Sequence, residues 1–107
     1  MVARVHLPAS CRSGEIIAVR VVIQHPMETG FRYDVRGNRV EKNVIHQLIC
    51  RYNGTEIFRA DMGSGIAANP FLQFHTIAGQ SGDLVFEWVD DRGVRGEERA
   101  RLLVTGT

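Results

Sequence analysis

The residues best suited to chemistry in this chain are four histidines and two cysteines, whose imidazole and thiolate groups can act as borderline-soft metal ligands. They are spread along the sequence as His6, Cys11, His25, His46, Cys50 and His75. No two of them form a close pair such as C-x2-C or H-x3-H, so a metal site would depend on distant segments converging. We therefore predict no metal site and no cofactor.

Nucleophilic catalysis has equally little support in the sequence. The strained G-x-S-x-G turn that exposes a catalytic serine is missing. His46 and Cys50 share one face of a predicted strand, but their spacing separates them by about 13 Å along the strand axis. That distance is too long for a base to activate a thiol. We predict that the chain has no catalytic residue and is not an enzyme.

The two cysteines allow two interpretations. Cys11 and Cys50 are either separate thiols or a disulfide that closes a loop of about 40 residues, with a stabilisation of ~4 kcal/mol on the loop-entropy model. The sequence gives no Cα–Cα distance, so both interpretations stay open at this point.

The composition limits the classes of fold and function that the chain can have. The 107 residues, 44% hydrophobic and 23% charged, predict one globular domain spanning 1–107. The net charge is +1 and the charges are mixed along the chain, so no basic stripe for nucleic acid is evident. The apolar runs are too short for a membrane span, and Met1–Leu7 does not resemble a secretory signal, which by itself favours the cytoplasm.

Period-two alternation of apolar and polar residues dominates the chain, and helical periodicity is hard to find. In the segment Glu15–Gln24, the residues Ile17, Val19, Val21 and Ile23 form an uncharged, β-branched face that we assign to the core. The predicted strands are Val2–Leu7, Glu15–Gln24, Val44–Tyr52, Thr55–Asp61, Phe71–Ile77, Asp83–Asp90 and Glu98–Thr105. About seven short strands without a helix predict an all-β, immunoglobulin-like antiparallel sandwich.

Particular residues refine this prediction. Asn53-Gly54 predicts a two-residue type I′ hairpin turn, because both of its central residues need positive φ. Trp88 is the expected core anchor, and Gly96 predicts a bulge near the start of the last strand. In the third strand, alternation places His46 on the same face as Leu48 and Cys50.

Two irregular segments interrupt the strands. The first begins at His25-Pro26-Met27-Glu28-Thr29-Gly30, where proline ends a strand and glycine permits a turn. It continues to Lys42, and its 34–39 part can form a small hairpin. The second segment, Met62–Pro70, is glycine-rich at its start. Loops this long are usually functional or disordered.

Several pieces of the sequence together are similar to one family. They are His25–Gly30, Asn53-Gly54 with Glu56–Phe58, Asn69–Phe74, Gly82-Asp83, and Trp88–Asp90 with Asp91-Arg92-Gly93. Their order and spacing resemble SoxZ, the small subunit of the SoxYZ sulfur-carrier complex of bacterial thiosulfate oxidation. The resemblance covers nearly the whole chain and implies an immunoglobulin-like sandwich.

The resemblance also implies a function without catalysis in this chain. It implies a heterodimer with SoxY, whose C-terminal Gly-Gly-Cys-Gly-Gly arm carries sulfur intermediates covalently, and transient contacts with other sulfur-oxidation enzymes. It implies the periplasm, reached by co-export with a signal-bearing partner, where a disulfide would be chemically permitted. Isolated from that partner, the chain could self-associate.

The surface expected to contact partners lies in the two irregular segments, because both interrupt regular strands with proline. The residues expected there are His25, Pro26, Met27, Glu28, Thr29, Gly30, Asn69, Pro70 and Phe71. An equally simple interpretation is that these corners only end strands.

Two alternatives to this function remain. A His-Pro-Met step also occurs in the iron-binding superoxide reductases, which are immunoglobulin-like, although this chain lacks the Cys-Asn-x-His segment that would complete such a site. The other alternative is a generic binding sandwich without a sulfur role.

Overall fold

The computed structural model describes residues 2–106 and contains seven β-strands, with no helix in that range. The strands are β1 (Ala3–His6), β2 (Ile16–Ile23), β3 (Ile45–Tyr52), β4 (Thr55–Asp61), β5 (Phe71–Ile77), β6 (Gly82–Asp90) and β7 (Arg95–Leu102). The described residues contain no helix that is long and apolar enough to cross a membrane.

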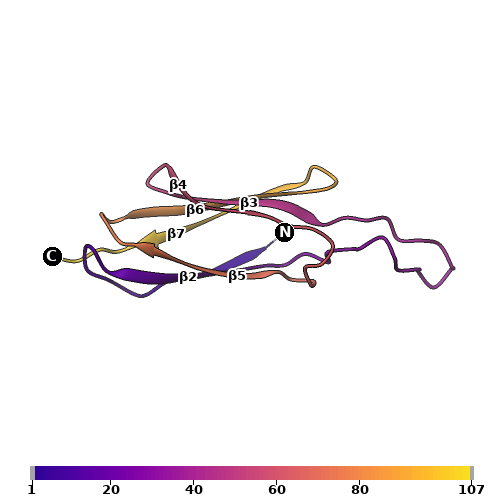
Figure 1. Cartoon of the computed structure of the whole chain (residues 1–107), viewed down its shortest axis with the longest axis horizontal. Coiled ribbons are helices and arrows are strands. Elements are labelled where there is room, and N and C mark those ends of the chain that lie inside the picture. Colours follow the sequence, from indigo (N-terminus) through magenta and orange to yellow (C-terminus); the bar gives the residue numbers. More distant parts are fainter. Residues whose placement is uncertain (1, 107) are drawn as a thin grey trace.

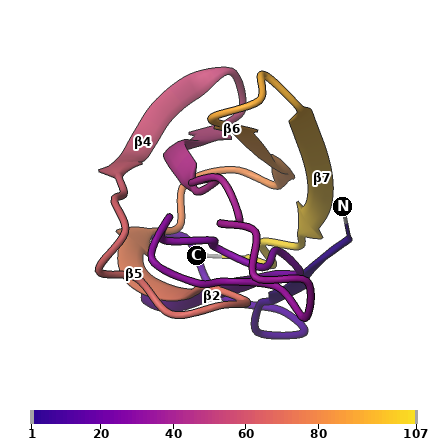
Figure 2. The same ribbon diagram turned by 90° about the vertical axis from the view of Figure 1, so that its right-hand side faces the viewer.

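The strands form two antiparallel sheets packed face to face as an immunoglobulin-like sandwich (Figures 1 and 2). One sheet has the order β1-β2-β5 and the other has the order β4-β3-β6-β7. Every named strand pair is antiparallel. The predicted fold class is therefore confirmed.

The core lies between the sheets, where the apolar faces of the alternating strands meet. Ile17, Val19, Val21 and Ile23 of β2 are all buried, as their β-branched face predicts. From the opposite sheet, β6 contributes Leu84, Phe86 and Trp88 to the same core cluster. At one side of the sandwich, Phe58 of β4 stacks on Phe74 of β5 with ring centroids 4.2 Å apart.

The turn chemistry follows the sequence closely. Asn53 and Gly54 connect β3 to β4 with φ values of 49° and 84°, which confirms the predicted type I′ geometry. Gly93, between β6 and β7, also has positive φ, at 78°. These short turns set the antiparallel pairing of the four-stranded sheet.

The last strand differs from the prediction in position and regularity. It runs from Arg95 to Leu102, and the segment after it carries Val104, which pairs with Cys11 in a parallel bridge. The ladder between β6 and β7 is continuous, so the predicted bulge at Gly96 is wrong. Gly96 lies opposite Trp88, and a Cβ at this position would be 2.2 Å from an indole carbon. The glycine makes room for the ring.

The third strand contains a shift that alternation alone does not predict. The pairing of β3 with β6 slips between Ile45 and Gln47, so Ile45 is fully buried and His46 is exposed. The prediction that His46 shares a face with Leu48 and Cys50 is therefore wrong, because one irregular step changes the side to which a side chain points.

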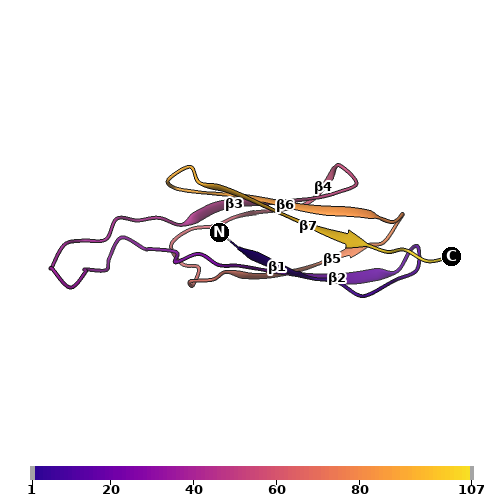
Figure 3. The same ribbon diagram turned by 180° about the vertical axis from the view of Figure 1, so that it is seen from behind.

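A long projection leaves one end of the sandwich (Figures 1 and 3). It consists of the chain between β2 and β3, drawn from purple to magenta, and it runs along the long axis of the molecule. The molecule is accordingly elongated, with extents of 60 × 19 × 19 Å. Isolated bridges pair Glu28 with Asn43 and Tyr33 with Arg39. We call residues 28–43 the ribbon.

Candidate functional site

The two irregular segments singled out in the sequence meet at the end of the sandwich from which the ribbon departs. The side-chain oxygen of Asn69 accepts a hydrogen bond from the His25 backbone N–H at 3.1 Å. The Asn69 N–H donates to the His25 carbonyl at 2.8 Å. Asn69 reaches both groups with a φ of 54°, a value that asparagine tolerates better than most residues. The structure thus joins positions far apart in the sequence.

His25 is a buried connector between β2 and β6. Its Nε2 lies 3.2 Å from a carboxylate oxygen of Asp90, and its Nδ1 accepts a hydrogen bond from the Met27 N–H at 2.9 Å. Because Nδ1 accepts, the ring proton belongs on Nε2, where it is donated to Asp90. Both ring nitrogens are therefore occupied within the chain.

Asp90 is buried and gathers several donors. One of its oxygens accepts from the backbone N–H groups of Arg92 at 2.9 Å and Val94 at 3.0 Å. Burial raises the pKa of this carboxyl, but the hydrogen bonds from Val94, His25, Arg92 and Asn43 outweigh burial and leave the pKa below its usual range. Asp90 is thus a carboxylate at neutral pH and holds the hexapeptide against the β6–β7 turn.

Met27 and the residues after it anchor the base of the ribbon. Met27 is buried with a φ of 49°, and its sulfur lies 3.3 Å from the backbone nitrogen of Ile45. Glu28 and Asn43 exchange two backbone hydrogen bonds, each of 2.9 Å. The Met27 contact fixes the base of the ribbon on β3, and the paired backbone bonds join the two sides of the ribbon to each other.

Gly30 permits the close approach of the two sides of the ribbon. Its φ is +90°, and a Cβ on it would lie 3.2 Å from the Cβ of Lys42. Its carbonyl accepts a hydrogen bond from Arg39 Nε at 2.5 Å. The predicted turn at this glycine therefore lies within an ordered, hydrogen-bonded base.

The predicted contact residues differ in their access to a partner. His25, Met27, Gly30 and Pro70 are buried within the chain; Glu28 and Thr29 are half-buried; Pro26, Asn69 and Phe71 are exposed. Any contact with another protein must therefore rely mainly on the half-buried and the exposed residues of this set. Their role as a partner surface stays a prediction.

Sequence reasoning missed three exposed residues of the ribbon. Phe31, Tyr33 and Val35 are large and apolar, and they are among the most exposed hydrophobic side chains of the described chain. The available signal was their period-two spacing, which is typical of a half-buried strand. The surrounding charges and glycine obscure this signal, because they are typical of an irregular loop.

The two cysteines are separate and buried, so the disulfide interpretation is wrong. Cys50 lies in the core, where desolvation raises its thiol pKa to about 12. Burial, followed by the charge of Glu15, raises the pKa of Cys11 as well. Neither environment favours the thiolate, which is the reactive form of cysteine.

The candidate metal ligands do not converge. Among residues 2–106, no group of three or more histidine, cysteine and carboxylate side chains is placed to hold a metal ion. His6 is on β1, His46 on β3 and His75 on β5, and all three are exposed. His25 is already bonded at both nitrogens.

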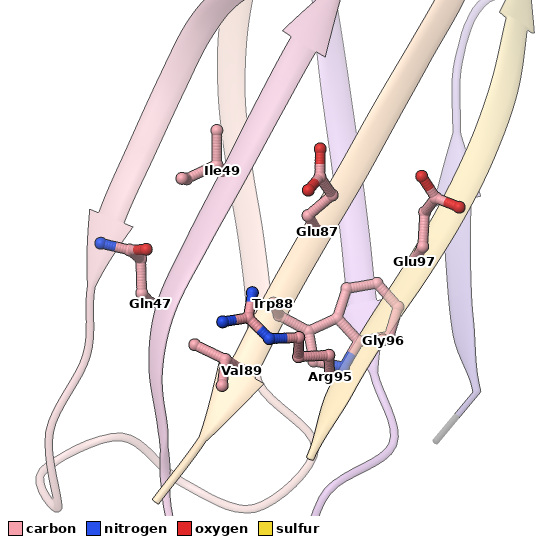
Figure 4. A pocket seen from close by; sticks show the side chains of 8 residues that line it. All are labelled: Gln47, Ile49, Glu87, Trp88, Val89, Arg95, Gly96 and Glu97. Atoms are coloured by element: carbon pink, nitrogen blue, oxygen red, sulfur yellow. The ribbon is translucent and has the colours of Figure 1, made fainter. Parts of the chain in front are cut away.

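A shallow pocket of about 250 Å³ lies on the four-stranded sheet (Figure 4). Its lining comes from β3, β6 and β7, with Gln47, Ile49, Glu87, Trp88, Val89, Arg95, Gly96 and Glu97. The volume is below the usual range for small-molecule sites. The lining contains no thiol, hydroxyl or imidazole, so the pocket offers no nucleophile for sulfur chemistry.

Comparison with known proteins identifies the family of this chain and solved structures that share its fold. Residues 5–101 match the family described as "Sulphur oxidation protein SoxZ". A curated relative, bacteriocin helveticin-J from Lactobacillus helveticus, is 34% identical over 89 residues. That alignment covers 80% of this chain and 26% of the bacteriocin, so the chain spans about a quarter of the relative's length.

Two solved structures illustrate the shared fold. A superoxide reductase (neelaredoxin) from Ignicoccus hospitalis has a TM-score of 0.74 and 18% identity, covering 98% of this chain and 81% of its own. The sulfur carrier protein SoxY from Chlorobium limicola f thiosulfatophilum has a TM-score of 0.67 and 11% identity, covering 96% and 78%. At such identities the likeness concerns the fold alone. The family match, which extends over most of the sequence, shows that this chain belongs to the SoxZ family of sulphur oxidation proteins.

Proposed function

We propose that this chain is the non-catalytic subunit of a sulfur-carrier complex. It pairs with a SoxY-type subunit, whose C-terminal cysteine arm carries covalent sulfur intermediates during thiosulfate oxidation. The observation that carries the proposal is the SoxZ family match over residues 5–101. The likeness in fold to a SoxY carrier supports a pair of related sandwiches.

The burial of the thiols supports a role without covalent chemistry for this subunit. Burial raises the pKa of Cys50 to about 12, so this thiol is protonated at pH 7. Carrying sulfane or sulfonate groups requires a reactive thiolate that partner enzymes can reach. A cysteine on a partner's flexible arm meets that requirement better.

The proposal includes a place and a recognition role. The complex works in the periplasm, reached by co-export with the signal-bearing partner. The surface around Pro26, Glu28 and Phe71 helps to position the carrier for the enzymes of the pathway. Support comes from the geometry at this end of the sandwich, where the two irregular segments adjoin and leave these residues accessible.

Co-expression with a candidate SoxY tests the pairing. Size-exclusion chromatography with mass measurement should give a stable heterodimer of one copy of each chain. The proposal fails if no arm-bearing chain binds, or if the purified polypeptide alone captures sulfane or turns over a substrate.

The recognition role has its own test. Glu28→Ala removes a carboxylate that accepts two hydrogen bonds from Arg32 without touching the core, whereas Met27→Ala also disturbs the buried base. Carrier turnover with partner enzymes should fall in Glu28→Ala while the heterodimer stays intact. Unchanged turnover would remove the recognition role.

A second candidate function is a metal or redox domain, favoured by the fold likeness to superoxide reductases. To ligate iron, His25 would have to give up its hydrogen bond with Asp90 or with Met27. Elemental analysis of purified protein distinguishes the two: stoichiometric iron would support the redox domain. A generic binding sandwich is disfavoured if a gene for a chain ending in Gly-Gly-Cys-Gly-Gly lies beside this one.

A further inference from the structure

The ribbon is an ordered, hydrogen-bonded projection. Its two sides are joined at the base by the paired backbone bonds of Glu28 and Asn43. Farther out, the Val40 N–H donates to the Arg32 carbonyl at 2.8 Å. The backbones of Tyr33 and Arg39 pair in an isolated antiparallel β-bridge. Two-stranded ribbons are marginal by themselves in water, so the buried base is what makes this projection persist.

The tip of the ribbon is also closed by specific bonds. One carboxylate oxygen of Asp34 accepts from the N–H groups of Arg36 and Asn38, each at 2.9 Å. The Gly37 N–H donates to the Asp34 carbonyl at 3.0 Å, with Gly37 at a φ of +81°. Aspartate satisfies turn backbone in this way, and glycine supplies the positive φ.

One face of this ribbon is apolar and uncovered. Phe31 is 80% exposed, Tyr33 is 65% exposed and Val35 is fully exposed. Phe31 and Tyr33 are two residues apart on one side of the ribbon, which places both on one face, with Arg32 on the other face. Val35 follows in the tip turn, which the Gly37 N–H closes onto the Asp34 carbonyl. Such alternation is typical of a strand with one buried side, yet no segment of residues 2–106 covers this one.

The exposed apolar surface of Phe31 and Tyr33 is comparable with the largest patch that a typical monomer carries. Aromatic side chains have about 200 Å² available for burial, so Phe31 and Tyr33 together expose roughly 300 Å² before Val35 is added. Contiguous patches of this size mark interaction surfaces more often than chance. A standard protein interface covers about 800 Å² per side, so Phe31 and Tyr33 alone supply a substantial part of such an area.

The other exposed apolar residues are less continuous. On the three-stranded sheet, Ile16 pairs with Ile77, and Val22 pairs with Phe71. These two pairs are six residues apart along β2, which separates them by roughly 20 Å. Arg20 lies between them with its guanidinium bonded to the side chain of Gln73. The sheet therefore presents two small apolar spots separated by a charged residue, whereas Phe31 and Tyr33 are neighbours on one face of the ribbon.

We propose that the apolar face of the ribbon, formed by Phe31 and Tyr33 next to the exposed Val35 of the tip turn, is the docking surface for the SoxY-type carrier subunit. This inference rests on the proposed function. A permanent partner best explains the surface, because long-lived interfaces are the more apolar ones and transient encounters are small and polar. Aromatic anchors of this kind usually supply most of the binding free energy.

The experiment compares two double variants in the co-expressed complex. Phe31→Ser with Tyr33→Ser changes the ribbon face, and Ile16→Ser with Ile77→Ser is the matched control, since Ile16 and Ile77 are 68% and 64% exposed. The ribbon variant should weaken heterodimer binding by about 100-fold, as expected for the loss of two aromatic anchors. The control should stay within about threefold, as expected for residues that contribute little to the contact.

Two further measurements support the interpretation. The melting temperature of each isolated variant should match that of the parent chain, because the changed side chains are exposed. Amide hydrogen exchange across residues 31–40 should slow on binding in the parent complex. A loss of affinity with unchanged melting then reports a lost contact and not a lost fold.

The outcomes distinguish this inference from the proposed function. If the parent chain binds no carrier, the proposed function fails first. If the parent binds and the ribbon variant binds equally well, or if both double variants lose affinity alike, the docking proposal is overturned. It is also overturned if the ribbon variant loses only self-association or only transfer to partner enzymes, since the occupant is then a second copy or an enzyme.

Discussion

The buried pair of His25 and Asp90 makes a sharp prediction through the substitution Asp90→Asn, which keeps the shape and removes the charge. In the parent chain, Asp90 accepts from His25 at 3.2 Å and from the Arg92 and Val94 N–H groups. In the variant, the asparagine oxygen can keep the hydrogen bonds from the Arg92 and Val94 N–H groups. Its NH2 group then points toward the Nε2–H of His25. Two buried donors then oppose each other.

No rearrangement of these side chains removes that conflict. If the asparagine flips, its NH2 faces the two backbone donors. If His25 moves its proton to Nδ1, that proton faces the Met27 N–H, which lies 2.9 Å away. An unsatisfied buried donor costs about 1–3 kcal/mol, and each backbone bond loses the added strength of a charged acceptor. Removing a buried charge offsets part of this loss, so we expect destabilisation of about 3 kcal/mol.

Thermal and urea unfolding followed by circular dichroism would measure the effect. For a domain of this size, 3 kcal/mol corresponds to a fall in Tm of about 10–15 °C. The matched control is Asp91→Asn, because Asp91 is exposed and its side chain accepts a hydrogen bond from the Val44 N–H at 3.1 Å, which an amide oxygen can also accept. We expect the control to change stability by less than about 0.5 kcal/mol.

The pH dependence gives an independent check with a definite sign. The folded-state pKa of Asp90 lies below its usual value, so its contribution is present above the unfolded pKa of about 3.9 and is lost as the pH falls through the folded pKa. The stability difference between the parent and Asp90→Asn should shrink as the pH falls below about 4. A variant that melts with the parent, or a difference independent of pH down to 2, would refute this account.

Two further predictions concern the core. Gly96→Ala places a Cβ 2.2 Å from the Trp88 ring and should destabilise by about 1–3 kcal/mol in urea unfolding, whereas Gly63→Ala, with open space around it, should change stability by less than about 0.5 kcal/mol. Equal effects would argue against the close packing of the indole. Cys11 and Cys50 should resist a thiol reagent for minutes in the native protein at pH 8 and react together in denaturant, because both are buried with raised pKa values. Rapid native labelling, or a mass two daltons lighter that shifts on reduction, would contradict their placement.

Local rules were enough to predict most of the sandwich. The expected strands Thr55–Asp61 and Phe71–Ile77 match the structure at both ends. The inward face of β2 was also predicted correctly, from Ile17 to Ile23. Alternation, β-branching and turn residues act between near neighbours, so their consequences can be deduced from the chain in order. The resemblance to SoxZ, carried by short motifs, was confirmed in the same way.

The candidate site was only partly predictable. The sequence singled out the hexapeptide and Asn69-Pro70-Phe71, and the structure shows that these segments touch through His25 and Asn69. It could not indicate that His25 faces Asp90, because these residues are 65 positions apart and their meeting depends on how the two sheets pack. Their pairing makes His25 a buried residue that connects the end of β2 to β6 within the chain.

The sequence alone therefore determined the strand content, the main turns and the family. The tertiary structure decided the position of β7, where Gly96 must lie opposite Trp88, and the separation of the two thiols. It also decided that the face of Phe31 and Tyr33 is left uncovered. These features depend on register and on which surfaces meet across the fold. Such choices are set by packing over the whole chain, which no local pattern contains.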